Sequence, residues 1–325
     1  MSAVPAQEPV EPTGARAAEA APRARQDESC VILNAGSGKR RAEALAATLE
    51  REFARQGLPA RLRLIRKGSD LEGAAREAAD EGFGTVVAGG GDGTINAVAG
   101  AIAGTGARLG VIPLGTFNYV ARSLGLPETP EAAVGVLATG RPRPLPLGEV
   151  NGRVFLNNAS LGAYAKILET RESVYRRFGR SQLAAHWSVV TALAEYRSPL
   201  DARVTVDGEA RRLHTPLAFV ANNAFQLEQF DFHESAERVR GGEFALFLAP
   251  DREPFDLIRF AAALGLKQLK PGRDFEMLYG KEIVVETRRP RRLVARDGER
   301  EKMTGPFRFL RKDGALEVLA PAEGG

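Results

Sequence analysis

The chain has 325 residues, of which 44% are hydrophobic and 26% are charged. This length suits two domains of ordinary size, and the composition excludes a wholly disordered, collagenous or coiled-coil protein. The 45 Lys and Arg residues exceed the 41 Asp and Glu residues, which leaves a net charge of +4. Such a mild excess is compatible with an anionic ligand or surface but identifies neither. Because Cys30 is the single cysteine, an intrachain disulfide is excluded and a reducing, cytoplasmic location is expected.

The first 28 residues are rich in Ala, Pro, Glu, Gln and Arg and carry almost no large apolar side chain. Such a segment cannot bury enough apolar surface to offset the entropy that it would lose on ordering, so residues 1–28 are predicted to be a disordered tail. The start of the chain lacks the basic and apolar regions of a signal peptide. No apolar run approaches the roughly eighteen residues that a membrane-spanning helix needs.

Residues 29–143 alternate short apolar runs with helical patterns. Strands are expected at residues 30–33, 61–65, 85–88 and 109–112, and helices ending at residue 55 and covering residues 71–81, 94–102 and 130–139. Strands and helices that alternate at this spacing predict a doubly wound α/β domain, in which helices cover both faces of a parallel sheet. Ligands of such domains bind at the carboxyl ends of the strands.

Residues 144–325 show a pattern closer to that of antiparallel sheet. Residues 141–144 read as a linker. Strands are then expected at 145–150, 154–158, 202–206, 217–221, 244–249, 281–287, 293–296 and 316–319, with helices near 182–196 and 254–269. Asp207-Gly208 and Asp297-Gly298 are strong hairpin signals. The sequence therefore predicts a second, mainly antiparallel β domain, with the active-site cleft between the two domains.

The most informative stretch is the glycine-rich turn after the strand at 85–88, where Gly89 to Gly91 precede Asp92-Gly93-Thr94. Consecutive glycines leave main-chain amides uncovered, and the helix that begins near Thr94 adds the positive end of its dipole, so the turn predicts a phosphate cradle. Asp92 is unfavourable beside phosphate unless a cation lies between them, which suggests Mg²⁺ or a hydrogen-bonding role. An ordinary strand-to-helix turn with an aspartate cap is the alternative.

Two common nucleotide-binding motifs do not fit. Gly36-Ser37-Gly38-Lys39 resembles the end of a P-loop, but Leu33 occupies the place of the required upstream glycine and Arg40 follows the lysine. No GxGxxG pattern can be aligned on residues 89–93. A Walker-type ATPase and a Rossmann dehydrogenase both lose support.

Three ordered motifs together resemble the diacylglycerol kinase catalytic family, which includes bacterial diacylglycerol kinases and sphingosine kinases. The segment 34–38 is similar to the NPxSG loop of that family, residues 90–94 match its GGDGT signature, and residues 113–118 are similar to PxGTxN. The resemblance implies nucleotide contacts from Asn34, Gly36, Ser37, Gly38, Gly90, Gly91, Asp92, Gly93, Thr94, Ile95, Asn96, Gly115, Thr116 and Asn118.

The chemistry that the resemblance implies is transfer of the γ-phosphoryl group of ATP, with Mg²⁺, to a lipid hydroxyl, and diacylglycerol is the default acceptor. Glu299 is the implied base that accepts the hydroxyl proton, and Asp92 is the implied acid at the phosphate site and a candidate ligand of the catalytic Mg²⁺. Asp207-Gly208-Glu209 repeats the three residues of Asp297-Gly298-Glu299. Sequence alone therefore leaves Glu209 as the alternative base.

The chain departs from the family pattern at two places. Tyr119 stands where many members carry the aspartate of GTxND, and residues 240–245 replace an acidic segment that holds a structural Mg²⁺, so no second metal site is predicted. An NAD kinase, which shares GGDGT, remains an alternative. A relative that has lost catalysis but still binds lipid or nucleotide is the other.

A lipid kinase must meet its substrate at a membrane surface, and basic side chains are attracted to anionic lipids. Four arginines supply a candidate contact with the inner face of the membrane: Arg171, Arg176, Arg177 and Arg180. No nucleic acid is expected as a partner, because aromatic residues are not interleaved with the basic ones. A homodimer is left open.

Overall fold

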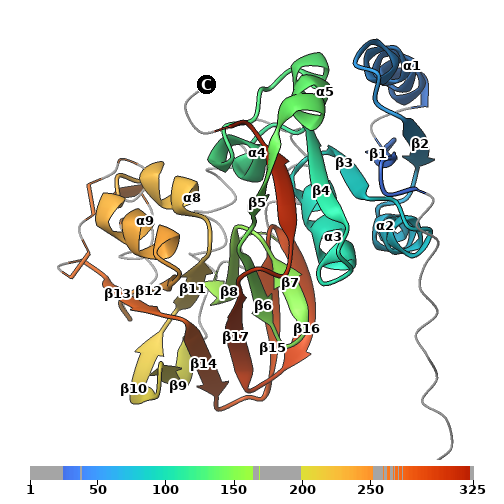
Figure 1. The fold of residues 1–325 in the computed structure, drawn as a ribbon. Helices are drawn as coiled ribbons and strands as arrows, with labels where there is room; N and C mark the ends of the chain where they lie inside the picture. Colours follow the sequence, from blue (N-terminus) through green and yellow to red (C-terminus); the bar gives the residue numbers. More distant parts are fainter. Residues whose placement is uncertain are drawn as a thin grey trace, which may run out of the picture.

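The computed structural model describes residues 25–36, 39–163, 199–251 and 274–322, together with the single positions 168, 259, 262, 263, 266, 268, 269, 271 and 272. These residues form an α/β domain and a domain of two packed antiparallel sheets, side by side (Figure 1). The expected helix at residues 182–196 and most of the expected helix at 254–269 lie outside the described residues.

The first domain is built on a six-stranded sheet with the order β2-β1-β3-β4-β18-β5. Four of its strands are parallel neighbours: β1 (Ser29–Asn34), β2 (Ala60–Ile65), β3 (Thr85–Gly90) and β4 (Arg108–Pro113). Helices α1 (Lys39–Arg55) and α5 (Pro130–Thr139) pack on one face, and α2 (Leu71–Asp80) and α3 (Asp92–Ile102) pack on the other. The predicted doubly wound sheet is confirmed.

The register of the parallel strands brings their carboxyl ends together. Leu33 of β1 lies opposite Gly89 of β3, and Gly90 lies opposite Pro113 of β4. The segments that follow these strands therefore leave the sheet at the same edge. Those segments are the three glycine-containing loops singled out in the sequence.

The end of the chain differs from the prediction. Residues 316–319 were expected in the second domain, but β18 (Glu317–Ala320) returns to the first sheet, where it pairs with β4 and with β5 (Arg141–Pro144). The expected linker at 141–144 is this edge strand β5. Proline is tolerated at the edge of a sheet because the missing N–H need not enter a ladder. The first domain is thus completed by residues from the far end of the sequence.

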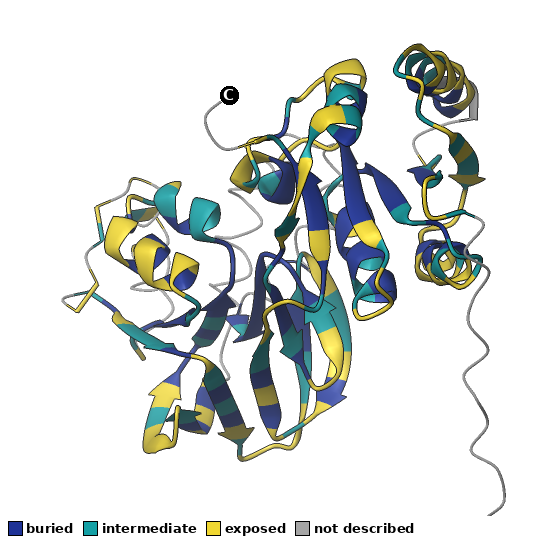
Figure 2. Ribbon diagram, viewed as in Figure 1, coloured by how far each residue is buried: buried dark blue, intermediate teal, exposed yellow. Residues whose placement is uncertain are grey.

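The second domain is a sandwich of two six-stranded sheets. One has the order β10-β9-β14-β17-β6-β7, and its strands are β6 (Leu147–Val150), β7 (Arg153–Phe155), β9 (Leu200–Val206), β10 (Glu209–Thr215), β14 (Glu282–Thr287) and β17 (Phe307–Lys312). The other has the order β13-β12-β11-β8-β15-β16, and its strands are β8 (Asn158–Gly162), β11 (Leu217–Ala221), β12 (Phe244–Leu248), β13 (Glu276–Gly280), β15 (Arg291–Arg296) and β16 (Glu299–Thr304). Alternate residues face the shared core between them, as the banding in Figure 2 shows.

Short helices complete the two domains. The second sheet carries α8 (Ala224–Glu228) and α9 (His233–Arg240) on its outer face, where Leu227, Phe232 and Val239 pack on the strands. In the first domain, α4 (Tyr119–Ser123) follows the third glycine loop and contacts α8. No helix among the described residues is long and apolar enough to cross a bilayer.

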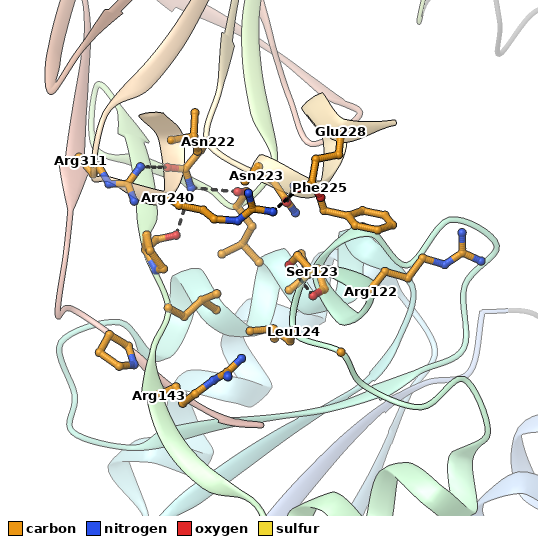
Figure 3. Close-up of a pocket in the computed structure, with 18 residues that line it drawn as sticks. Arg122, Ser123, Leu124, Arg143, Asn222, Asn223, Phe225, Glu228, Arg240 and Arg311 are labelled. Carbon is orange, nitrogen blue, oxygen red and sulfur yellow. Dashed lines mark hydrogen bonds and ion pairs between the residues drawn. The ribbon is translucent and has the colours of Figure 1, made fainter. Parts of the chain in front are cut away.

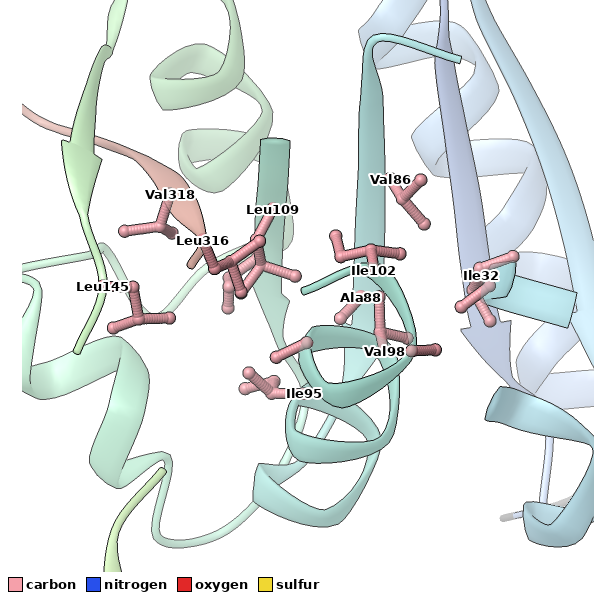
Figure 4. Packing of buried hydrophobic residues seen from close by; sticks show 14 of the residues in the cluster. Ile32, Val86, Ala88, Ile95, Val98, Ile102, Leu109, Leu145, Leu316 and Val318 are labelled. Carbon is pink, nitrogen blue, oxygen red and sulfur yellow. The ribbon is translucent and has the colours of Figure 1, made fainter. Parts of the chain in front are cut away.

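One apolar core joins the two domains. Leu147, Leu156 and Leu316 pack in the same cluster as Ile95 and Val98 of α3. Figure 4 shows Leu145, Leu316 and Val318 beside this helix. The orientation of the β sandwich relative to the glycine loops is therefore fixed by buried apolar contacts.

The predicted tail divides at residue 24. Residues 1–24 lie outside the described residues, whereas residues 25–28 pack on the first domain. Arg25 forms an ion pair with Glu81 at 2.7 Å and lies over the ring of Phe83, and the N–H of Gly84 donates to the Arg25 carbonyl. The composition of the segment did not predict this packing, because an Arg side chain counts as charged although its long stem is apolar.

The shared core can be tested with a pair of identical substitutions. Leu147→Ala removes a fully buried side chain at the domain junction and should lower the free energy of unfolding by about 2–5 kcal/mol. Leu64→Ala in β2, where the side chain is 40% exposed, should change it by less than about 1 kcal/mol. Urea denaturation measures both. Equal losses would contradict a core that spans the junction.

Candidate active site

A cleft of about 760 Å³ separates the carboxyl ends of the parallel strands from the β sandwich. Its walls come from both domains. The first domain contributes Asn34, Gly91, Gly93, Thr94 and Asn96, and the second contributes Arg153, Arg296, Glu299 and Glu301. The structure thus brings the predicted glycine turn and the predicted base to one space, although they are about 200 positions apart in the chain.

The glycine turn leaves little room for side chains at Gly90 and Gly91. A Cβ atom at Gly90 would lie 2.3 Å from Thr94 Oγ1, and one at Gly91 would lie 3.2 Å from Gly115 Cα. Gly91 is the cap residue of α3, and its carbonyl accepts from the N–H groups of Thr94 and Ile95. A helix N-terminus approached by bare main chain is a site suited to phosphate.

The first loop is tied to this helix through Asn34 at the end of β1. Its side-chain Nδ2 donates to Thr94 Oγ1 at 3.0 Å, and its Oδ1 accepts from the N–H of Gly36 at 3.0 Å. Asn96, on the next turn of α3, is 7% exposed, and its Oδ1 has no hydrogen-bond partner among the described residues. Because a buried oxygen without a partner is costly, Asn96 has an acceptor available for a ligand in the cleft.

The third loop closes on itself beside the glycine turn. Asn118 has a φ of 48°, and its side chain accepts from the Gly115 N–H and donates to the Gly115 carbonyl, both at 3.0 Å. A Cβ at Gly115 would lie 2.7 Å from Gly91 Cα, so the two loops meet main chain to main chain. Phe117, which is 57% exposed, stacks parallel to Tyr119 with ring centres 5.7 Å apart.

Asp92 connects the second loop to the third. Its half-buried carboxylate accepts from the N–H of Val120 at 3.3 Å. Burial raises the pKa of Asp92, and hydrogen bonds from the main-chain N–H groups of Val120, Tyr119 and Asn118 partly offset this shift. The carboxylate therefore faces the start of α4 and lies at the junction of the two loops.

Glu299 is held at the cleft by the turn that precedes it. Asp297 and Gly298 both have positive φ, 46° and 88°, as a tight hairpin requires. The half-buried Asp297 carboxylate accepts from three main-chain N–H groups where the chain enters β8, those of Leu156 at 2.7 Å, Asn157 at 2.8 Å and Asn158 at 3.1 Å. This anchor fixes the first residue of β16, the exposed Glu299, against the cleft.

The second Asp-Gly-Glu segment lies elsewhere. Asp207 adopts the same left-handed conformation, with a φ of 45°, and its carboxylate accepts from the N–H groups of Lys281 and Glu282. Glu209 then begins β10, the strand at the opposite end of that sheet from β7. It is not part of the cleft wall in the described structure. Of the two carboxylates that sequence left open, the structure places Glu299 opposite the glycine turn.

Four charged residues of the cleft were missed in the sequence: Glu72 at the start of α2, and Arg153, Arg296 and Glu301 of the second domain. Glu301 lies between two guanidinium groups, 3.3 Å from Arg153 Nη2 and 3.4 Å from Arg296 Nη2. Arg296 also donates to the carbonyl of Val154 at 2.7 Å. The sequence indicates two of these residues only through their positions beside turns. Arg153 follows the Asn151-Gly152 turn, and Arg296 precedes the Asp297-Gly298 turn.

The remaining predicted contacts fall in different places. Ser37 and Gly38 lie outside the described residues, as do Arg171, Arg176, Arg177 and Arg180. Ile95 is fully buried, so its side chain belongs to the core. Thr116 is exposed on the third loop, and the Gly90 carbonyl accepts from the N–H of Leu114.

An apolar pocket of about 240 Å³ lies next to the third loop, between α8 and the outer face of the second sheet. Its wall contains Tyr119 together with the side chains of Phe219, Leu227, Phe230, Phe232, Phe247 and Met277. Aromatic and aliphatic walls of this kind bind hydrocarbon. Which apolar residues would form this pocket could not be predicted from the sequence, since the strands of the domain are apolar throughout.

Comparison with solved structures supports the fold. A diacylglycerol kinase from Bacillus anthracis strain Sterne superposes with a TM-score of 0.68, covering 90% of this chain and 97% of that one at 18% identity. The expected architecture, an N-terminal parallel-sheet domain and a C-terminal antiparallel domain, is the fold of that protein.

Comparison of sequences gives the family. Residues 28–150 match the model of the diacylglycerol kinase catalytic domain. A Pseudomonas aeruginosa protein named "Probable lipid kinase YegS-like" is 38% identical over 144 residues, 44% of this chain and 46% of that one. The diacylglycerol kinase of Bacillus subtilis is 33% identical over 182 residues, 55% of this chain and 59% of that one. The chain spans about half the length of these curated relatives, and its similarity to the diacylglycerol kinase catalytic domain lies in residues 28–150.

The anchor under Glu299 makes a prediction about pH. Burial raises the pKa of Asp297 to about 6, above the value of about 3.9 expected in the unfolded chain. The folded state therefore holds this proton more tightly, and the stabilisation that results is present below about pH 4 and is lost as the pH rises through about 6.

We expect the free energy of unfolding of the wild type, measured against that of Asp297→Asn, to fall by about 2–3 kcal/mol between pH 4 and pH 7. Urea titrations at several pH values measure this difference. The Asn variant is the control because it cannot titrate. A slope of the opposite sign would show that the three N–H donors outweigh burial.

Proposed function

We propose that the chain is a lipid kinase that transfers the γ-phosphoryl group of ATP to a lipid hydroxyl, with diacylglycerol as the default acceptor. The observation that carries the proposal is the cleft in which the glycine turn of one domain faces Glu299 of the other. Relatives named lipid kinase and diacylglycerol kinase support the same reaction class.

The nucleotide side of the reaction is assigned to the first domain. Phosphate oxygens would accept from main-chain N–H groups at the start of α3, where Gly90 and Gly91 keep side chains away. Arg153 and Arg296 add positive charge from the opposite wall. In phosphoryl transfer, positioning and neutralisation of charge supply most of the catalysis.

The residues present fit a Mg²⁺ ion that is held mainly by the nucleotide. Within the described part of the chain, no group of three or more His, Cys, Asp or Glu side chains could hold a metal. Mg²⁺ in kinases usually needs one or two protein carboxylates besides the substrate phosphates. Asp92, between Gly91 and Gly93 of the cleft wall, is the candidate carboxylate, and the unpartnered Oδ1 of Asn96 is a second oxygen on α3. When bound, the ion would neutralise charge on the phosphates.

Glu299 is assigned as the base. An exposed carboxylate at the cleft can accept the proton of a hydroxyl as its oxygen attacks phosphorus. Asp297 acts through it as a positioning residue, since three hydrogen bonds hold the turn on which Glu299 is carried.

The acceptor is assigned to the apolar pocket beside Tyr119. Its hydrocarbon-like wall suits an acyl chain and offers little to the charged and polar groups of NAD, which disfavours the NAD kinase alternative. Such a substrate places the reaction at a membrane surface, so we propose a cytoplasmic protein that visits the inner face of the membrane. The four arginines at 171–180 and a homodimer remain predictions.

The matched Asp-Gly-Glu turns allow a direct test of the base. Glu299→Gln should lower the turnover of diacylglycerol by about 10²–10⁴-fold, because proton transfer is lost while shape is kept. Glu209→Gln, in the equivalent turn outside the cleft, should leave turnover unchanged. Transfer of radioactive phosphate from ATP to lipid measures both. Loss in Glu209→Gln with activity retained in Glu299→Gln would reverse the assignment.

A second pair of variants tests Asp92. Asp92→Asn keeps an acceptor for the Val120 N–H but removes the charge, so turnover should fall at least about 100-fold while the melting temperature stays within a few degrees. Asp207→Asn is the matched control, because that carboxylate also accepts main-chain N–H groups but lies outside the cleft.

The acceptor is compared in the same assay. Labelling of NAD in place of lipid would establish the NAD kinase alternative. Binding of ATP·Mg²⁺ by calorimetry, without labelling of diacylglycerol, sphingoid bases or a crude lipid extract, would instead identify a relative that has lost catalysis through changes such as Tyr119.

A further inference from the structure

A second cleft lies between the two domains, on the other side of the third loop from the glycine turn. It has a volume of about 820 Å³ and opens between α4 and α8 (Figure 3). Its described wall shares no residue with that of the candidate active site. Its size falls within the range of about 300–1,000 Å³ that is typical of ligand sites.

The wall of this second cleft is strongly basic. Four guanidinium groups line it, those of Arg122, Arg143, Arg240 and Arg311, and Glu228 is the one carboxylate in the described wall. In Figure 3 the side chain of Arg143 extends into the space from below, while Arg240 reaches across from above. Such an excess of positive charge in a concave surface favours an anion.

The rim arginines can exchange their present partners for a ligand. Arg240 pairs with Glu228, and the two side chains are 54% and 32% exposed. Arg122 pairs with Glu128 at 2.9 Å, with exposures of 41% and 66%. Ion pairs this exposed contribute about 1 kcal/mol or less, whereas a forked contact from Arg to phosphate is stronger and more directional.

Arg311 gives the cleft a rigid basic wall. Its side chain is 5% exposed. Its Nη1 donates to Asn222 Oδ1 at 3.3 Å and to the carbonyl of Glu243 at 3.0 Å, and its Nε pairs with Asp313 at 2.9 Å. A charge held in one place by several hydrogen bonds costs little further entropy when a ligand binds.

Half of the cleft is apolar. Leu124, Leu145, Leu156, Phe225 and Val239 line it between the arginines. A free inorganic anion would leave this surface in contact with water, whereas a molecule with a phosphate at one end and hydrocarbon at the other would cover both kinds of surface.

We propose that the second cleft is a binding site for a phosphate-bearing amphiphile, distinct from the site of phosphoryl transfer. Its phosphate would contact Arg143 and Arg240, and its apolar part would lie on Phe225 and its neighbours. The shared chemistry is a phosphate ester, supplied either by an anionic phospholipid or by a soluble metabolite.

A ligand in this cleft would contact α4, directly after the third loop. Val120 lines the second cleft, and its N–H donates to Asp92 Oδ1. On the opposite wall, Asn223 donates to the Tyr119 carbonyl at 3.5 Å and to Asn157 Oδ1 at 2.7 Å. Occupation would therefore order the loop that positions Asp92.

Calorimetry with three probes tests the proposal without relying on turnover. Dihexanoyl phosphatidylmethanol carries a phosphate anion but no hydroxyl, so it is neither acceptor nor product of a lipid kinase. Dihexanoyl phosphatidylcholine has the same chains and no net charge, and inorganic phosphate has no chains. Each probe is titrated into the full chain, into Arg143→Gln/Arg240→Gln, and into the control Arg203→Gln/Arg211→Gln, whose exposed, ion-paired arginines lie on β9 and β10.

We expect phosphatidylmethanol to bind the wild type and the control at least tenfold more tightly than the cleft variant, and phosphatidylcholine to bind at least tenfold more weakly than phosphatidylmethanol. In an alternative outcome, inorganic phosphate binds as tightly as phosphatidylmethanol and loses as much affinity in the cleft variant. That result would support the binding site and identify its ligand as a soluble phosphate ester. Equal binding of phosphatidylcholine, unchanged binding in the variant, or no binding of any anion would overturn the proposal. If the double variant does not fold, Arg240→Gln alone replaces it in the same titrations. These binding measurements do not depend on phosphoryl transfer, so their failure can be distinguished from failure of the lipid-labelling assay that tests the proposed function.

Discussion

The relative position of the two domains depends on one set of buried apolar contacts. The segments that cross between the domains contain Leu145, Leu147 and Leu316, and these side chains pack in the core of the first domain beside α3. Helix α3 begins at the glycine turn, where phosphate is proposed to bind. The same helix also packs against apolar side chains of the β sandwich. The distance between the turn and Glu299 is thereby fixed by burial of hydrocarbon, which is not directional but resists deformation because the core is closely packed.

A repeated device then sets the fine geometry. At several turns a short polar side chain with positive φ, Asp207, Asp297 or Asn151, captures main-chain N–H groups of a neighbouring segment. The local chemistry of Asp207 and Asp297 is the same, and both precede Gly-Glu. They differ in what lies opposite, because β15 and β16 end at the cleft while β9 and β10 end at the far side of the sandwich (Figure 1). Only the former pair can place a glutamate near the glycine turn.

The third loop separates the spaces that the structure offers to ligands. Asp92 and Gly91 touch it from the side of the proposed nucleotide site, Tyr119 lines the apolar pocket, and Val120 lines the basic cleft. At residue 119 the chain has an aromatic ring where the aspartate of the family motif is expected. That ring extends the apolar wall and removes a charge from the junction. Tyr119 in place of that aspartate thus gives the apolar pocket part of its hydrophobic wall.

Features that depend on neighbouring residues could be predicted before the fold was known. Apolar runs predicted β1, β3 and β4, the glycine turn predicted a phosphate cradle, and three ordered motifs predicted the similarity to diacylglycerol kinases, because dihedral preferences and periodicity are local properties. The tertiary structure alone decided which Asp-Gly-Glu turn faces that cradle, that β18 returns to the first sheet, and that Arg153 and Arg296 enter the cleft. These outcomes depend on contacts such as the hydrogen bond from the Asn157 N–H to Asp297, which joins residues 140 positions apart. No local pattern encodes such a pairing, since it is selected by the burial of the whole core.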